Sequence, residues 1–131
     1  MEFLVSLHSY WRYVVLVAAV IALGVTLARW FGTELIPVSV RRVGALYIMA
    51  LDIQFLIGLI IWLGEQRYNI PGFFRYEHPT IMLLAVIAAH AGQVMSRKAA
   101  SETAAARTLA IAVIVSLVLV LVGIPGVVRQ P

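Results

Sequence analysis

Four long apolar segments follow one another in the sequence, and they constrain the fold more than any other feature. They cover residues of about 3–30, 40–63, 79–96 and 104–128. Each is close to or above the ~20 residues that cross the hydrocarbon core of a bilayer. Because lipid offers no hydrogen-bond partners, each segment must pair its own backbone groups, as an α-helix does. The sequence therefore predicts an all-α membrane protein with a single four-helix transmembrane domain over residues 1–131.

The low charge of the chain supports a lipid environment. Hydrophobic residues make up 63% of the sequence and charged residues only 12%, whereas soluble domains carry roughly 25% charged residues. The absence of cysteine excludes disulfides, thiolate metal sites and haem linked through cysteine. The net charge of +4 does not indicate nucleic-acid binding, because the basic residues lie in short connections between apolar segments. The expected surroundings are membrane lipid.

The connections between the segments predict the topology. They are short and contain turn-forming Gly and Pro residues, so sequential helices are expected to form an up-down-up-down four-helix bundle. The first and third connections carry six basic residues, and the two ends and the middle connection carry four. Basic residues favour the cytoplasmic side. Both termini and the long middle connection are therefore expected outside.

Two polar clusters, at residues 8–13 and 75–80, mark the outer rim of the first and third segments. Each contains a histidine, His8 in the first cluster and His78 in the second. The first and third helices run in the same direction in this topology, so His8 and His78 are expected at a similar depth. That arrangement suits two axial ligands that hold one b-type haem near the outer face.

Further residues in the two clusters can complete such a site. Arg12 follows His8 by one helical turn, and Arg75 lies near His78, so either guanidinium can bind a haem propionate. Glu77 or a backbone carbonyl can hold the second ring nitrogen of an axial histidine. In the alternative interpretation, His8 and His78 are interfacial residues that bind backbone groups or Glu77 and hold no cofactor.

A second polar group is expected in the middle of the bundle. Asp52 and His90 have similar expected depths, and Gln54 and Gln93 lie nearby. Ionisable groups within a membrane usually face the bundle interior or each other. We expect these four residues to form a buried network. Its role is either structural, through hydrogen bonding, or functional, as a proton path or a quinone contact. His90 follows His78 by twelve residues, roughly 18 Å along a helix, and is a poor second ligand for the same haem.

The sequence contains no motif of a known catalytic site. It has no glycine-rich phosphate loop, no HExxH motif and no convincing Ser-His-Asp arrangement. We therefore expect the protein to have no catalytic activity of its own.

Three blocks of sequence resemble a known family. They are residues 7–13 (LHSYWRY), residues 76–79 (YEHP) with Met82, and Gly92 followed by Ser96-Arg97-Lys98. Together they resemble a family of small bacterial four-helix membrane proteins, often labelled cytochrome b-like, with LHSxxRW and EHP motifs. Tyr13 stands where that family often has Trp. The resemblance implicates His8, Arg12, Glu77 and His78, and it implies the inner (cytoplasmic) membrane of a bacterium.

Besides a quinone or pigment pocket without haem, two functions are compatible with these features. The first is electron transfer between a quinone and a membrane or periplasmic partner through one haem b near the outer face. The second is that of a non-catalytic accessory subunit, whose helices contact other transmembrane subunits of a respiratory or photosynthetic redox complex.

Overall fold

The chain forms four long α-helices and one short 3-10 helix. The structure is a computed structural model, and it describes residues 1–125. The elements are α1 (Glu2–Trp30), α2 (Val40–Gly64), η1 (Arg67–Asn69), α3 (Glu77–Arg97) and α4 (Glu102–Val122). By length and composition, each of the four α-helices is able to cross a membrane. The predicted number of helices and their apolar character are confirmed.

Three helix boundaries differ from the prediction by two residues or more, and one of them is the start of α4 at Glu102 rather than near residue 104. α3 begins at Glu77 rather than at Pro79, so that Pro79 is the third residue of the helix, a position in the first turn where no backbone donor is needed. α4 ends at Val122, and the predicted helix is wrong over residues 123–125, because Pro125 has no N–H to continue the helical hydrogen bonds and disfavours helical backbone in the residue before it. Residues 126–128, the rest of that prediction, lie outside the described residues.

Serine caps define the start of α2 and of α4. Ser39 accepts a hydrogen bond from the backbone N–H of Arg41, and Ser101 accepts one from that of Ala104. These side chains satisfy N–H groups that have no partner within the helix. The Glu102 carboxylate also binds Arg41, with 3.0 Å between Nη1 and Oε1, and accepts a hydrogen bond from Ser39. The starts of α2 and α4 are therefore joined.

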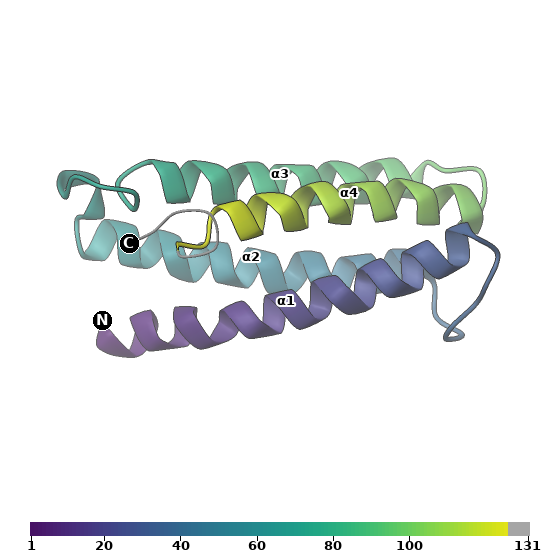
Figure 1. Ribbon diagram of the computed structural model, residues 1–131, viewed down its shortest axis with the longest axis horizontal. Coiled ribbons are helices and arrows are strands. Elements are labelled where there is room, and N and C mark those ends of the chain that lie inside the picture. The colour runs from purple at the N-terminus through teal and green to yellow at the C-terminus, as the bar shows by residue number, and fades with distance from the viewer. Residues whose placement is uncertain (126–131) are drawn as a thin grey trace.

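The four long helices lie side by side with their long axes roughly aligned (Figure 1). The α1–α2 and α3–α4 connections lie at one end, and the N-terminus and the α2–α3 connection lie at the other. α1 and α3 each pack against α2 and α4, and within residues 1–125 the backbones of α1 and α3 are not in contact. α1 and α3 therefore lie diagonally opposite each other in the bundle.

In the centre of the core, side chains of α2 and α4 and a carbonyl of α3 are joined by hydrogen bonds. Tyr47 on α2 is fully buried, and its hydroxyl lies 2.7 Å from that of Ser116 on α4. Ser116 donates its proton to the carbonyl of Ala85 on α3, so Tyr47 is the donor to Ser116.

Toward the C-terminal end of α3, Gly92 lies against Ala112 of α4, and a Cβ at Gly92 would overlap the methyl group of Ala112. Small residues therefore let α3 and α4 approach closely.

Candidate functional site

A cavity lies at the end of the bundle where α1 and α3 begin and α2 and α4 end. Its volume is about 270 Å³, near the lower end of the roughly 300–1,000 Å³ of small-molecule sites. All four helices and the segment after α4 contribute to its lining. The polar side chains and small residues in that lining include His8, Ser9, Arg12, Gln54, Gly58, Arg67 and His78. The cavity occupies the region where α1 and α3 are not in direct contact.

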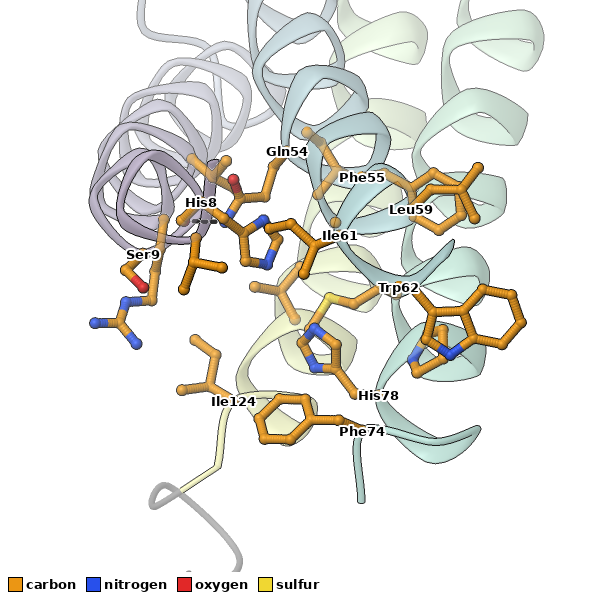
Figure 2. Close-up of a pocket in the computed structure, with 18 of the residues that line it drawn as sticks. His8, Ser9, Gln54, Phe55, Leu59, Ile61, Trp62, Phe74, His78 and Ile124 are labelled. Carbon is orange, nitrogen blue, oxygen red and sulfur yellow. Dashed lines mark hydrogen bonds between the residues drawn. The ribbon is translucent and has the colours of Figure 1, made fainter. Parts of the chain in front are cut away.

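His8 and His78 extend from opposite helices into this cavity. Their ring centroids are 6.3 Å apart, and the ring planes make an angle of 83°. Figure 2 shows the two rings pointing toward one another, with Gln54 above and Phe74 below them. The proximity that parallel first and third helices predict for these two histidines is therefore present.

Each histidine is held by its surroundings in a defined position. His78 Nδ1 lies 2.8 Å from the carbonyl oxygen of Gly123. Because a carbonyl only accepts, Nδ1 of His78 carries a proton and its Nε2 is left for another partner. The backbone carbonyl of His8 accepts a hydrogen bond of 2.7 Å from Gln54 Nε2. Gly58 makes room for the His8 ring, since a Cβ at Gly58 would lie 3.0 Å from Cε1 of His8.

Polar atoms without partners are concentrated at the cavity. Within the described part of the chain, four buried side-chain nitrogen or oxygen atoms have no hydrogen-bond partner. Three of them, His8 Nδ1, Arg12 Nε and Gln54 Oε1, belong to residues that line the cavity. An unsatisfied buried polar atom costs roughly 1–3 kcal/mol. Such atoms, gathered around one cavity, indicate a site that is completed by a polar ligand.

Two residues predicted for this site do not line the cavity. Arg75 donates a hydrogen bond from Nε to the carbonyl of Tyr68, and its guanidinium lies over the ring of Tyr76. Glu77 begins α3 with an exposed side chain. The Arg75 side chain is therefore held within the α2–α3 connection by Tyr68 and Tyr76. Arg67 of η1 is the cation that lines the cavity from this connection.

The predicted pair of Asp52 and His90 forms, but it is not buried. His90 Nε2 lies 2.9 Å from both carboxylate oxygens of Asp52, and the side chains are 50% and 43% exposed for His90 and Asp52 respectively. Gln54 lies in the cavity wall, where its Nε2 donates a hydrogen bond to the backbone carbonyl of His8. Gln93 donates a hydrogen bond to the backbone carbonyl of Arg41, near the other end of the bundle. The expected buried network of four residues is therefore wrong. Asp52 follows the buried Leu51, and the turn of ~100° per residue carries it toward the outer face of α2.

Three residues of the site have roles that the sequence did not predict. Trp11 donates its indole N–H to the carbonyl of Ala50 at 2.8 Å, and this bond fixes α1 against α2 one turn after His8. In the sequence Trp11 indicates only a membrane interface. The sequence suggests that Gly58 lies at a contact between helix backbones, whereas in the structure it lies against the imidazole of His8. The carbonyl of Gly123 has no signal in the sequence, because any residue can supply a backbone acceptor.

Comparison of the chain with models of protein families, with characterised proteins and with solved structures finds no significant match. Among residues 1–125, no group of three or more His, Asp or Glu side chains is arranged to hold a metal ion. The site is therefore interpreted from its own residues, chiefly His8 and His78.

Proposed function

We propose that the protein is an integral membrane protein that binds one b-type haem between His8 and His78 and carries electrons between a quinone and a membrane or periplasmic partner. The observation that carries the proposal is the distance between the two rings. A nitrogen bonded to a metal at roughly 2.0 Å puts its ring centroid about 3 Å from the metal, so two axial imidazoles have centroids about 6 Å apart. The centroids of His8 and His78 are 6.3 Å apart.

The protonation of His78 also fits an axial ligand. A metal-binding imidazole is neutral, and its other ring N–H is usually held by an acceptor that fixes the tautomer and the ring orientation. The Gly123 carbonyl holds Nδ1 of His78 in this way. Nε2 of His78 is then the nitrogen with a free lone pair.

Arg12 is suited to bind a carboxylate of the same ligand. Its Nε is buried without a partner, and the residue lines the cavity together with His8. Guanidinium groups bind carboxylates through paired, charge-assisted hydrogen bonds, and haem carries two propionates. A haem is larger than the cavity of about 270 Å³, so part of it would lie in the opening of the cavity to the surface.

The bound haem would supply a one-electron redox centre, and the protein residues would control its position and surroundings. His8 and His78 would hold it between α1 and α3, and Trp11 and Gln54 hold α1 against α2. The resemblance of residues 7–13 and 76–79 to cytochrome b-like proteins agrees with this function, because it includes both histidines.

The proposal includes insertion of all four helices, alternately up and down, in the inner membrane of a bacterium. Its support is the apolarity of α1–α4 and the exposure of many large apolar side chains. With the basic α1–α2 and α3–α4 connections inside, both termini and the α2–α3 connection face outward. Single cysteines at Thr33 and Ala100 should be shielded from an impermeant thiol reagent in intact cells, whereas one at Asn69 should be labelled. Labelling of all three positions would contradict this topology.

The haem proposal is tested by the reduced-minus-oxidised visible spectrum of protein purified from membranes. We expect the spectrum of a low-spin b-type haem, and its loss in His8→Ala and in His78→Ala. His90→Ala is the matched control, because His90 lies outside the cavity, and it should keep the spectrum. A full spectrum in both variants of the cavity, or protein without haem in every preparation, would refute the proposal.

A second function is favoured by the exposed pair of Asp52 and His90. A polar pair on the outer face of apolar helices suggests a contact with other transmembrane segments. In this alternative the protein is a non-catalytic subunit of a larger redox complex, and His8 and His78 contact backbone groups or lipid head groups. Copurification with a stable complex that lacks haem in this subunit would favour it.

A further inference from the structure

We propose that the face of α2 and α3 around Asp52 and His90 is a docking surface for a second copy of this chain. The pair lies near the middle of both helices, which is the most apolar depth of a membrane span. Around it the exposed side chains are apolar, among them Leu56, Ile87 and Val94. This inference is independent of the haem proposal, because neither Asp52 nor His90 lines the cavity.

The exposure of the pair calls for a partner. Ionisable side chains at the middle of a membrane are costly when they face lipid, and they normally face other protein groups or water. Asp52 and His90 satisfy one another at 2.9 Å, yet about half of each side chain remains exposed. Carboxylate oxygens and the second imidazole nitrogen retain hydrogen-bonding capacity on that side.

A second copy fits this surface because the pair is complementary to itself. Copies in one membrane have the same orientation and depth, so a twofold axis along the membrane normal brings each pair opposite its own counterpart. In such an interface the same patch serves on both subunits, and the imidazole of one copy meets the carboxylate of the other. Hydrogen bonds between helices stabilise association within membranes. A different protein would need its own acid–base pair at this depth.

The absence of cysteine from the chain allows a direct test by disulfide crosslinking in reconstituted vesicles. Leu56 and Val94 each follow a member of the pair by one helical turn and are 58% and 48% exposed. Single cysteines at these positions should form disulfide-linked dimers under a membrane-permeant oxidant. The control is Val20→Cys, which is 65% exposed on α1 and should remain monomeric at the same protein-to-lipid ratio.

The contribution of the pair is tested in the Leu56→Cys protein. Asp52→Asn combined with His90→Ala should reduce the dimer fraction severalfold, whereas His8→Ala should leave it unchanged. Melting temperature of the variants in detergent verifies that each remains folded. No dimer at either cysteine, equal dimer from Val20→Cys, or crosslinking that is insensitive to the pair would overturn the proposal. Crosslinking in native membranes exclusively to a protein of different size would also overturn it.

Discussion

Gly58→Ala separates the stability of the bundle from the function of its cavity. A Cβ at position 58 would lie 3.0 Å from His8 Cε1, whereas ordinary contact begins at 3.4 Å. The His8 ring must then move by about 0.4 Å, about twice the tolerance of roughly 0.2 Å for a metal–ligand distance. If the displacement costs about 0.5–1.5 kcal/mol, as an off-rotamer side chain does, the haem dissociation constant should rise roughly two- to tenfold.

The same substitution should stabilise α2. Alanine in the middle of a helix is favoured over glycine by about 0.5–1 kcal/mol. The matched control is Gly24→Ala on α1, because a Cβ at Gly24 meets nothing within 4 Å. Haem titration and thermal unfolding in detergent should show weaker haem binding in Gly58→Ala alone, with no loss of apoprotein stability in either variant. Equal haem affinities in the two variants would refute the assigned contact between Gly58 and the His8 ring.

Two further substitutions test the core and the cavity. Tyr47→Phe removes the hydroxyl that donates to Ser116 and should lower the free energy of unfolding by about 0.6–1.5 kcal/mol, measured by denaturation in mixed micelles; an unchanged value would show that this bond adds no stability. Arg12→Gln should weaken haem binding about tenfold, the loss of one charge-assisted hydrogen bond, and the difference from wild type should vanish for haem with esterified propionates. A loss that persists with the ester would mean that Arg12 acts in some other way.

The fold was predictable because length and apolarity alone indicate helices that are able to cross a membrane. The ends of the helices were less predictable. α3 begins at Glu77, before Pro79, and α4 ends at Val122, well before the apolar segment ends. The proximity of His8 and His78 followed from parallel helices and a shared depth. That argument uses only positions along the helix axes, which the sequence provides.

Rotation about each helix axis was not predictable. Apolar residues lie on every face of α2 and of α3, so the sequence does not indicate which face of each helix points into the bundle. Asp52 was therefore expected inside but lies at the surface, and Gln54, two residues later, lines the cavity. The prediction that Arg75 belongs to the site of His78 failed for a different reason. Its position depends on the backbone of the α2–α3 connection, where its Nε binds the carbonyl of Tyr68.

The electron paramagnetic resonance spectrum of the oxidised, purified protein tests ligation by His8 and His78 most directly. Two imidazole ligands give a low-spin ferric signal, and replacement of one of them by alanine should convert it to a high-spin signal or remove the haem. We expect the low-spin signal in wild type and in His90→Ala, and its loss in His8→Ala and in His78→Ala. A low-spin signal that survives in either of these two variants would contradict the assignment of that histidine as an axial ligand.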